Sequence, residues 1–302
     1  MGNSKKKLIV ICGPTAGGKT GLALKLAKKF NGEIIAADSR TIYQEMNIGT
    51  AKPTMEQRLK IPHYLIDIIP PDREFTVAEF KEEALKVIHG IHRRYKIPFL
   101  VGGTGLYISS IVDNLDIPRV PPDKKLRTNL EKKIFKYGLD YLWQKLMKLD
   151  PQAAGFVQRQ NPRRIIRALE VCLKAKKPFS QLRRKNEPLF DCLQIGLALS
   201  KQKLFKRIDQ RTEQMIEKGL IDEVKELIKK YPSNLPSLNT IGYQEIIAYL
   251  KNEIGLNEAV DLIKKNTRQY ARRQMTWFKK DKTVKWIKTS EEAEKLVKNF
   301  LA

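Results

Sequence analysis

Apolar residues in the first hundred positions follow two kinds of pattern. Short, mostly apolar runs predict buried β-strands over Leu8–Cys12, Glu33–Ala37, Tyr64–Ile69 and Ile97–Val101. Between these runs, apolar residues recur at helical spacing over Gly21–Phe30 and Thr76–Arg94. Thr76 and Glu79 stand at the N-cap and capping-box positions of the second helix. Strands that alternate with helices predict an α/β fold on a mostly parallel sheet, with functional loops at the carboxyl ends of the strands.

A helical segment interrupts this alternation. Prolines occupy three of the five positions from 118 to 122 and indicate a boundary. After it the pattern is helical over Asp123–Tyr137, Gly138–Leu149 and Asn161–Lys174. A buried strand and further helices then follow, with a last strand and helix at the end: Cys192–Leu199, Lys201–Lys218, Ile221–Lys230, Gly242–Lys251, Asn257–Lys279 and Val284–Phe300. We therefore predict an α/β core over 1–118, a helical insertion over 119–190, and a mostly helical, basic return to the core over 191–302.

A phosphate-loop pattern, G-x-x-x-x-G-K-[ST], lies between the first predicted strand and the first predicted helix. Its residues are Gly13, Pro14, Thr15, Ala16, Gly17, Gly18, Lys19 and Thr20. Glycines let backbone N–H groups turn toward a phosphate, and the helix N-terminus adds positive potential. The Lys19 ammonium neutralises the anion, and the Thr20 hydroxyl is placed to bind Mg²⁺. The pattern predicts a di- or triphosphate site, and it refines the α/β fold to a P-loop NTPase-like core with an inserted all-helical domain.

Two more segments follow predicted strands in the same manner. Asp38 comes directly after the second strand, where a carboxylate could hold metal-bound water or accept a proton. A helix N-cap is an equally good explanation of Asp38 from spacing alone. The glycine-rich segment Gly102–Tyr107 follows a later strand, and its glycines permit either close approach to a ligand or a tightly packed turn.

The charge of the chain is strongly positive. It contains 58 Lys and Arg against 33 Asp and Glu, a net charge of +25. Such an excess favours binding to a polyanion, nucleic acid before an anionic membrane, although a lysine-rich surface is also consistent with it. Ten basic residues lie between Arg159 and Glu187, and ten more between Lys264 and Lys288. Tyr270, Trp277 and Phe278 interleave with the second cluster, as side chains that stack on bases would.

Other classes of protein are disfavoured. No apolar run reaches the length of a transmembrane helix. The cysteines, Cys12, Cys172 and Cys192, are three in number and far apart, so a disulfide scaffold is not expected. These features predict a reduced, cytoplasmic protein that does not enter a membrane.

Taken together, these segments resemble the tRNA dimethylallyltransferase family, the tRNA isopentenyltransferases of the bacterial type. The resemblance extends over nearly the whole chain. It rests on the phosphate loop and on the segments Asp38–Tyr43, Ile48–Pro53, His63–Asp67, Gly102–Tyr107, Arg163–Glu170, Ile241–Tyr243 and Thr267–Gln274. The chain departs from the family pattern at Ala16-Gly17, where Ala-Ser is frequent, and at Thr41, where Gln or Ala is common.

The resemblance implies transfer of a dimethylallyl group from dimethylallyl diphosphate to a tRNA. The acceptor would be the exocyclic N6 of the adenosine on the 3′ side of the anticodon. That base must leave the stack of the anticodon loop to be reached. Mg²⁺ is the implied cofactor, bound by Thr20, and family precedent favours a monomer.

The resemblance also implies roles for individual residues. The implied catalytic residues are Asp38, Thr104 and Arg211, with Asp38 as the acceptor of the N6 proton. The phosphate loop would hold the donor diphosphate. The implied tRNA contacts are Asp38, Ser39, Arg40, Thr41, Thr104, Arg127, Gln160, Asn161, Pro162, Arg163, Arg164 and Arg167. Arg207 lies one helical turn before Arg211 and could reach the same anion, or it could pair with Asp209 or Glu213 on a solvated helix face.

The phosphate loop by itself leaves other functions open. It equally fits a small-molecule or nucleoside kinase, or an NTPase that binds nucleic acid without prenyl chemistry.

Overall fold

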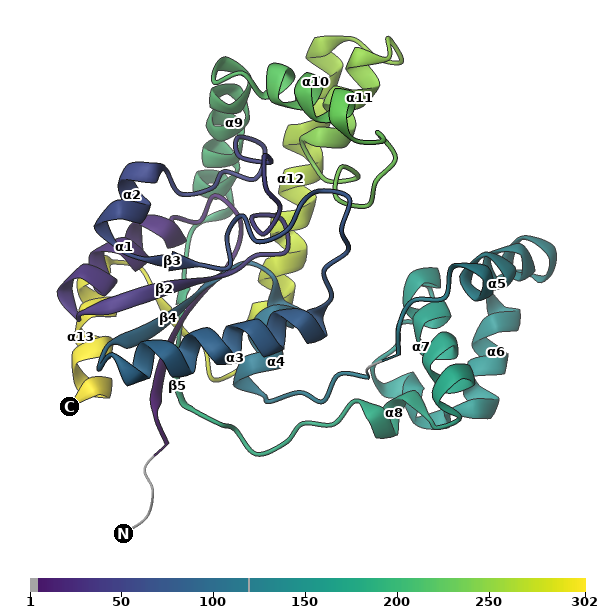
Figure 1. Ribbon diagram of the computed structural model, residues 1–302, viewed down its shortest axis with the longest axis horizontal. Coiled ribbons are helices and arrows are strands. Elements are labelled where there is room, and N and C mark those ends of the chain that lie inside the picture. The colour runs from purple at the N-terminus through teal and green to yellow at the C-terminus, as the bar shows by residue number, and fades with distance from the viewer. Residues whose placement is uncertain (1–4, 119) are drawn as a thin grey trace. The chain divides into compact units, whose positions relative to one another are not determined.

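The structure, a computed structural model, describes residues 5–118 and 120–302 (Figure 1). Its centre is a six-stranded sheet in the order β3-β2-β4-β1-β5-β6, in which every neighbouring pair of strands is parallel. The strands are β1 (Lys7–Cys12), β2 (Gly32–Ala37), β3 (His63–Tyr64), β4 (Ile97–Gly102), β5 (Asp191–Leu197) and β6 (Lys285–Ile287). The predicted α/β fold with a parallel sheet is confirmed.

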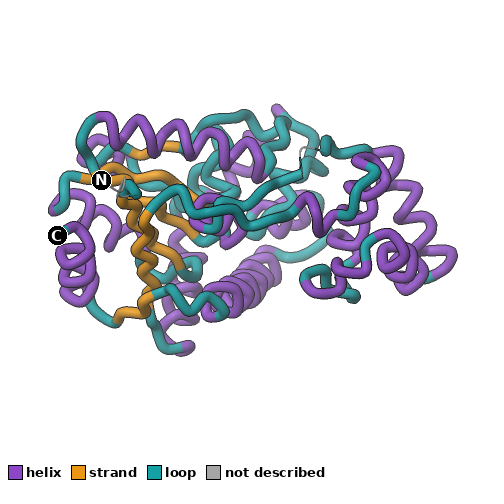
Figure 2. Tube along the Cα trace, turned by 90° about the horizontal axis from the view of Figure 1, so that it is seen from below, coloured by secondary structure: helices purple, strands orange, loops and turns teal. Residues whose placement is uncertain are grey.

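Helices cover both faces of the sheet (Figure 2). On one face, Leu8 and Val10 of β1 belong to a core shared with α3 (Val77–Arg93) and α4 (Gly105–Val112). On the other face, Ile9 and Ile11 pack with α1 (Lys19–Lys29) and α13 (Ser290–Leu301). A strand buried on both faces needs apolar side chains at every position, which is why β1 is a continuous apolar run. Thr76 caps α3 and forms the predicted capping box with Glu79.

The register of the sheet determines where the loops meet. Cys12 at the end of β1 and Ala37 at the end of β2 both pair with Gly102 at the end of β4. The residues that follow these strands therefore emerge side by side at the carboxyl edge of the sheet, as the sequence predicts.

A second apolar core lies beyond this edge. It joins Ile42, Tyr43 and Met46 to four helices of the C-terminal part. These helices are α9 (Lys201–Glu217), α10 (Leu220–Lys230), α11 (Tyr243–Leu250) and α12 (Leu256–Lys279). The core fixes α9 and α12 next to the loops that carry the candidate chemistry.

The chain divides into two compact units. One comprises the residues up to Val112 together with Leu189–Ala302, and the other comprises Asp113–Pro188. The second unit is helical and has its own apolar core, in which Leu142, Leu146 and Leu169 are fully buried. Its elements are α5 (Lys124–Tyr137), α6 (Leu139–Leu149), the 3₁₀ helix η1 (Pro151–Gly155), α7 (Pro162–Ala175) and α8 (Phe179–Leu182). The sequence predicts the helical insertion over 119–190, a range to be compared with Asp113–Pro188 for this unit. Residue 119 itself lies outside the described residues.

Some predicted elements are wrong. The strand predicted over Tyr64–Ile69 ends at Tyr64, because Leu65 and Asp67 have φ angles of 61° and 58° and turn the backbone away from the sheet. Several short helices escaped prediction: α2 (Met55–Lys60), η1, α8, and α4, whose sequence reads as a glycine-rich loop. In the described part of the chain, no helix is both long and apolar enough to cross a membrane.

Candidate active site

The phosphate loop connects β1 to α1 in a tight turn. Gly13 and Gly18 have φ angles of 133° and 95°, and Ala16 adopts the left-handed conformation with φ 58°. The Gly17 N–H donates to the Pro14 carbonyl over 3.1 Å, which closes the turn. The Lys19 ammonium folds back and donates to the same carbonyl over 2.7 Å. These bonds hold the loop in one conformation between the strand and the helix, and the phosphate site that the sequence pattern indicates stays a prediction.

Two arginines of α9 reach this loop from outside. Arg207 donates to the Gly17 carbonyl over 3.4 Å, and Arg211 donates to the Thr15 hydroxyl over 3.2 Å. A cavity of about 440 Å³ lies between the loop residues 16–21 and this face of α9.

The two acidic residues of α9 that could pair with Arg207 are bound elsewhere. Asp209 pairs with Arg268 over 2.5 Å, and Glu213 pairs with Lys264 over 2.7 Å. The alternative in which Arg207 pairs with Asp209 or Glu213 is therefore wrong. Both arginines of the predicted pair direct their positive charge toward the phosphate loop.

A smaller cavity, of about 100 Å³, brings two of the three predicted catalytic residues, Asp38 and Arg211, together with residues of the phosphate loop. Its polar lining includes Lys19, Thr20, Asp38 and Arg211. The rest of its wall is largely apolar and includes Ala23, Ile34, Ala36, Ile66 and Val101. The cavity therefore combines cations, one carboxylate and a hydrocarbon surface.

The charges in this cavity influence each other. Burial lowers the pKa of Lys19 to about 8, with the Asp38 carboxylate opposing the shift and the Arg211 guanidinium adding to it. Burial also lowers the pKa of Arg211, and Asp38 again opposes the change. Asp38 is thus near enough to both cations to stabilise their charged forms. A negatively charged ligand would do the same more strongly.

Asp38 ends β2 in a turn. Its Oδ1 accepts a hydrogen bond from the Arg40 N–H over 2.8 Å. The next helix along the chain, α2, begins only at Met55, so the helix N-cap explanation of Asp38 is wrong. Asp38 also lines the smaller cavity.

Thr104 lies across from Asp38 at the end of β4. Its hydroxyl accepts from the Ser39 N–H over 3.1 Å, and its own N–H donates to the Ala37 carbonyl over 3.2 Å. Tyr270 of α12 adds a hydroxyl to this group. Burial, and then the charge of Asp38, raise the pKa of Tyr270 to about 12, while a hydrogen bond with the Thr104 side chain opposes the shift. Tyr270 therefore joins Asp38 and Thr104 in one polar cluster.

The glycines after β4 are explained by packing. A Cβ on Gly102 would lie 2.0 Å from the Ala37 carbonyl oxygen, and one on Gly103 would lie 2.2 Å from Nε2 of Gln274. A Cβ on Gly105 would lie 2.4 Å from the ring of Trp277. These contacts support the tightly packed turn. Close approach to a ligand stays a prediction, and Gly102 does line the smaller cavity.

Gln274 is a residue of the site that sequence reasoning missed. It is 6% exposed, accepts from the Thr15 N–H over 2.8 Å and donates to the Gly103 carbonyl over 2.9 Å. One buried amide of α12 thus connects the phosphate loop to the loop after β4. Gln274 ends one of the segments on which the family resemblance rests, but the resemblance assigns no role to it. Its spacing to Trp277 puts both side chains on one helix face.

Two of the three aromatic residues of the second basic cluster pack against the rest of the protein. Phe278 is 3% exposed and belongs to the core beneath the sheet, and Trp277 packs against Gly105. The prediction for these two residues is wrong, because the helical period turns them toward the sheet while Arg272 and Arg273 remain exposed.

The predicted tRNA contacts near the sheet differ in their surroundings. The Arg40 guanidinium donates to the Pro236 carbonyl over 3.3 Å. Thr41 is 7% exposed, and its hydroxyl has no hydrogen-bond partner among the described residues. Thr41 therefore lines the smaller cavity rather than the outer surface.

The predicted tRNA contacts of the helical unit fall into two groups. Arg127 and Arg167 both bind Glu170, a fully buried carboxylate, over 2.8 and 2.6 Å. Arg163 and Arg164, in contrast, are exposed at the start of α7. The remaining members surround that helix start: Gln160 and Pro162 are exposed, and Asn161 caps α7 by accepting from the Arg164 N–H.

Comparison with known proteins identifies the family of this chain. A family profile described as IPP transferase matches residues 41–281, and one described as isopentenyl transferase matches residues 6–68. The tRNA dimethylallyltransferase of Acetivibrio thermocellus is 47% identical over 97% of this chain and 96% of its own length. That of Microcystis aeruginosa is 50% identical over 94% of this chain and 89% of its own length.

Solved structures agree with these relatives. The full-length tRNA isopentenylpyrophosphate transferase of Bacillus halodurans superposes with a TM-score of 0.73 at 40% identity, over 98% of this chain and 96% of that one. A eukaryotic dimethylallyltransferase acting on tRNA superposes with a TM-score of 0.75 at 32% identity, over 90% of this chain and 69% of that one. The resemblance drawn from the sequence is confirmed: the chain belongs to the IPP transferase family of prenyl-transferring enzymes, together with the tRNA dimethylallyltransferases.

Proposed function

We propose that the protein transfers the dimethylallyl group of dimethylallyl diphosphate to N6 of the adenosine directly 3′ of the anticodon in tRNA. The observation that carries the proposal is the smaller cavity, in which Lys19, Thr20, Asp38 and Arg211 meet a largely apolar wall. A phosphate site, a carboxylate and a hydrocarbon surface are the three features that this reaction requires together.

The cavity fits the donor at both ends. Lys19, Arg207 and Arg211 surround the phosphate loop and would neutralise the diphosphate. The apolar side chains, among them Ile34, Ile66 and Val101, suit a short hydrocarbon group. As the bond between the diphosphate oxygen and C1 of the dimethylallyl group breaks, negative charge grows on the diphosphate, and preorganised cations stabilise that charge.

Asp38 would act on the acceptor. The lone pair of adenine N6 is delocalised into the ring, so N6 attacks C1 readily only if its proton is removed as the new C–N bond forms. The Asp38 carboxylate takes that proton, and the products are the N6-dimethylallyl adenosine and diphosphate. Thr104 and Tyr270 lie beside Asp38 and would fix the orientation of the base.

The donor set around the phosphate loop fits Mg²⁺. Mg²⁺ prefers oxygen ligands, binds through one or two protein oxygens and substrate phosphates, and keeps several waters. The Thr20 hydroxyl is exposed at the start of α1 and lines the same cavity as the Asp38 carboxylate. Thr20 would hold the ion, which when bound supplies further stabilisation of the charge on the leaving diphosphate.

The tRNA would be held partly by the basic residues of the helical unit. Exposed Arg163 and Arg164, at the N-terminus of α7, are suited to contact backbone phosphates. A base taken out of the anticodon loop needs such flanking contacts to offset the cost of unstacking. We further propose that the protein acts as a monomer in the cytoplasm, which light scattering and cell fractionation would test.

The experiment that tests the proposed function is incubation with radiolabelled dimethylallyl diphosphate, Mg²⁺ and bulk tRNA. We expect label in tRNA, at the adenosine next to the anticodon after nuclease digestion. Phosphotransfer or rapid hydrolysis of ATP, with no label in tRNA, would instead favour a kinase or an NTPase. None of the relatives and structures named above is a kinase.

A further inference from the structure

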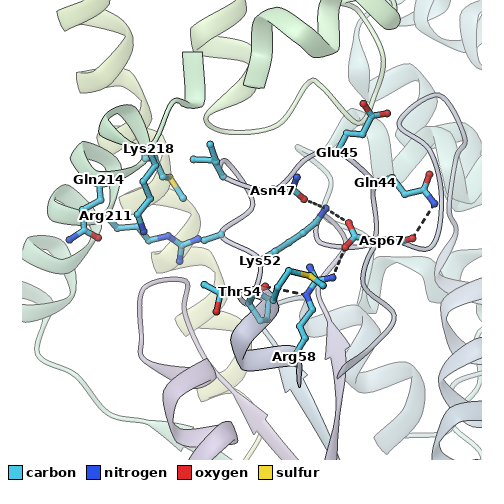
Figure 3. A pocket seen from close by; sticks show the side chains of 15 residues that line it. Gln44, Glu45, Asn47, Lys52, Thr54, Arg58, Asp67, Arg211, Gln214 and Lys218 are labelled. Carbon is cyan, nitrogen blue, oxygen red and sulfur yellow. Dashed lines mark hydrogen bonds and ion pairs between the residues drawn. The ribbon is translucent and has the colours of Figure 1, made fainter. Parts of the chain in front are cut away.

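One loop forms a wall of the donor cavity, and it contains little regular structure. Residues 43–53, here called the wall loop, connect the turn after β2 to α2. Thr50, Ala51 and Pro53 of this loop line the smaller cavity. Ala51 and Pro53 also line a larger, more open cavity of about 760 Å³, and Arg211 belongs to the lining of both (Figure 3). The position of the wall loop therefore determines the shape of the space in which the donor would bind.

The backbone of the wall loop makes few bonds within itself. The Met46 N–H donates to the Gln44 carbonyl over 2.8 Å, the Ala51 N–H to the Ile48 carbonyl over 3.0 Å, and the Lys52 N–H to the Asn47 carbonyl over 3.2 Å. Ala51 is in the left-handed conformation, with φ 49°. A short irregular segment of this kind needs contacts from its surroundings to hold one conformation.

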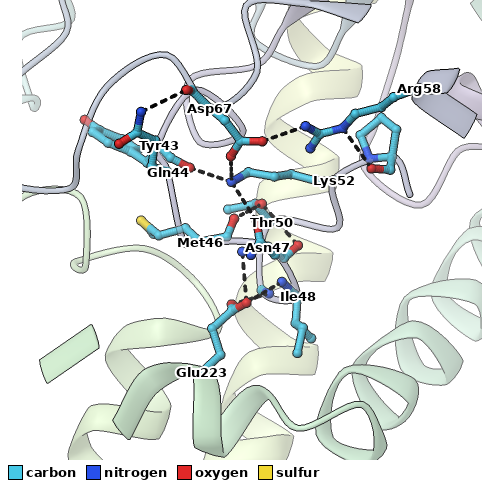
Figure 4. Close-up of polar contacts among 12 residues, drawn as sticks. Tyr43, Gln44, Met46, Asn47, Ile48, Thr50, Lys52, Arg58, Asp67 and Glu223 are labelled. Carbon is cyan, nitrogen blue, oxygen red and sulfur yellow. Dashed lines mark hydrogen bonds and ion pairs between the residues drawn. The ribbon is translucent and has the colours of Figure 1, made fainter. Parts of the chain in front are cut away.

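Glu223 of α10 supplies such contacts from one side. Its carboxylate accepts hydrogen bonds from three consecutive backbone N–H groups of the wall loop (Figure 4). The distances to the nitrogens of Asn47, Ile48 and Gly49 are 2.9, 2.8 and 3.2 Å. Consecutive N–H groups that point at one anion form a nest, and hydrogen bonds to a charged acceptor are stronger than those between neutral groups.

Tyr243 supports the same contact. It is fully buried, and its hydroxyl donates to the Glu223 carboxylate over 2.7 Å. Its ring lies against Gly49, where a Cβ would be 2.4 Å from a ring carbon. Any side chain at position 49 would push the wall loop off this ring. Burial and the nearby charge of Glu223 raise the pKa of Tyr243 well above its usual value, which keeps its hydroxyl protonated as a donor.

Lys52 anchors the loop from the opposite side. Its side chain is 3% exposed, and its ammonium binds the Tyr43 carbonyl, the Asn47 amide oxygen and the Asp67 carboxylate (Figure 4). Arg58 holds the other oxygen of Asp67 over 2.6 Å. Lys52 belongs to the loop itself, however, whereas Glu223 reaches it from another part of the chain.

The packing of α10 does not depend on Glu223. Leu220, Val224 and Leu227 form the buried face of this helix. The carboxylate projects from a different position of the first turn and is only partly buried. Its four hydrogen bonds therefore serve the wall loop and Tyr243 rather than the helix that carries it.

We propose that Glu223, supported by Tyr243, is a positioning residue that holds the wall loop in the conformation that binds the prenyl donor. The inference rests on the proposed function, because it assigns the wall loop to the donor rather than to the tRNA. It predicts that loss of the carboxylate weakens donor binding selectively.

The test compares Glu223→Ala with the wild type in three measurements: steady-state kinetics, calorimetric binding of dimethylallyl diphosphate and binding of tRNA. We expect the KM and the Kd for the donor to rise roughly 10-fold to 100-fold, the range for losing one or two net charge-assisted hydrogen bonds. The kcat at saturating donor and the Kd for tRNA should remain within about twofold of wild type, because Asp38 and the basic residues are unaltered.

The matched control is Glu226→Ala. Glu226 lies on the same helix, is 61% exposed and pairs with Lys229 on the surface. Its variant should match the wild type in all three measurements. Glu223→Gln keeps one acceptor oxygen and should restore part of the donor affinity, which a defect in general folding would not do. Tyr243→Phe should raise the donor KM in the same direction but by less.

The possible outcomes separate the two proposals. Unchanged donor KM in a folded Glu223→Ala protein, or an equal rise in the Kd for tRNA, would overturn the positioning role. If that variant does not fold, Glu223→Gln and Tyr243→Phe decide the question by the same split between donor and tRNA. Absence of prenyl transfer by the wild-type protein, with donor binding intact, would overturn the proposed function and leave the effect of Glu223 on donor binding still measurable.

Discussion

Two pairs of arginines, one pair in each compact unit, have opposite surroundings. In the first unit, Arg207 and Arg211 donate to neutral oxygens of the phosphate loop, and Asp209 and Glu213 of their own helix are bound to other cations. In the helical unit, Arg127 and Arg167 converge on the buried carboxylate of Glu170. The first arrangement leaves positive charge available for an anion, and the second largely neutralises it.

This difference matters for how a basic sequence is interpreted. Counting basic residues, as in the net charge of +25 and the two basic clusters, gives all these arginines the same weight. A buried carboxylate such as Glu170 costs much free energy unless cations compensate for it, so Arg127 and Arg167 stabilise the unit whether or not they touch RNA. Arg163 and Arg164 are exposed, and they are not the arginines that compensate the charge of Glu170.

The largest effect is expected for Lys19→Ala. Lys19 lies in the cavity with Arg211, and its removal leaves the diphosphate with one cation fewer at the loop. We expect turnover to fall by roughly 10³–10⁵, the range seen for cations that stabilise charge in phosphoryl chemistry. Donor binding should weaken and tRNA binding should persist, measured by calorimetry and filter binding. An equal loss of tRNA binding would show that the phosphate loop has been misassigned.

Asp38→Asn should have the next largest effect. Asparagine keeps the shape of the side chain and its bond to the Arg40 N–H but removes the basicity. We expect kcat to fall by roughly 10²–10⁴ with little change in the donor KM. Single-turnover rates with donor and Mg²⁺ titrations measure this. A joint shift in donor affinity and metal dependence would assign Asp38 to the metal, and turnover near that of the wild type would remove it from the chemistry.

The sequence predicted the fold and the centre of the site well, for a definite physical reason. Continuous apolar strands, a phosphate loop and polar residues at strand ends are local patterns, and a parallel sheet brings them to one edge. Contacts made by single side chains across long separations are not local. Gln274 reaches Thr15 and Gly103 from far along the chain, and Glu223 reaches residues 47–49. No pattern in a single sequence encodes such pairings.

The same limit explains the errors. Phe278 looked available for stacking because its neighbours are basic, but α12 buries one face and exposes the other. Asp67 looked like part of a strand because it lies between apolar residues. Lys52 and Arg58 hold its carboxylate in a turn instead.

The contrast between the units predicts a smaller effect on tRNA binding. Arg163→Ala with Arg164→Ala should lower the slope of log Kd against log salt by about 1.5–2, if both contact phosphates. Arg127→Ala should leave that slope nearly unchanged and lower the melting temperature instead, because Glu170 loses a bidentate partner. Salt titrations of tRNA binding and thermal melts measure both. An unaltered slope in the double variant would show that Arg163 and Arg164 are ordinary solvated side chains that do not contact phosphates.

The smallest effect concerns the protonation of Lys19. Its pKa of about 8 in the free protein lies well below the ordinary lysine value. A diphosphate favours the charged ammonium, so donor binding raises this pKa and takes up a proton. The uptake should be about half a proton per donor at pH 8 and about one tenth at pH 7, since those are the deprotonated fractions of a group with that pKa. Donor affinity then falls as the pH rises above 8, by a factor that approaches about ten per pH unit.

Calorimetry in two buffers of different ionisation enthalpy measures the uptake of protons directly, and Lys19→Met should abolish this uptake. If the wild type takes up no proton at pH 8, Lys19 is already fully charged in the free protein. Burial then does not lower the pKa of Lys19.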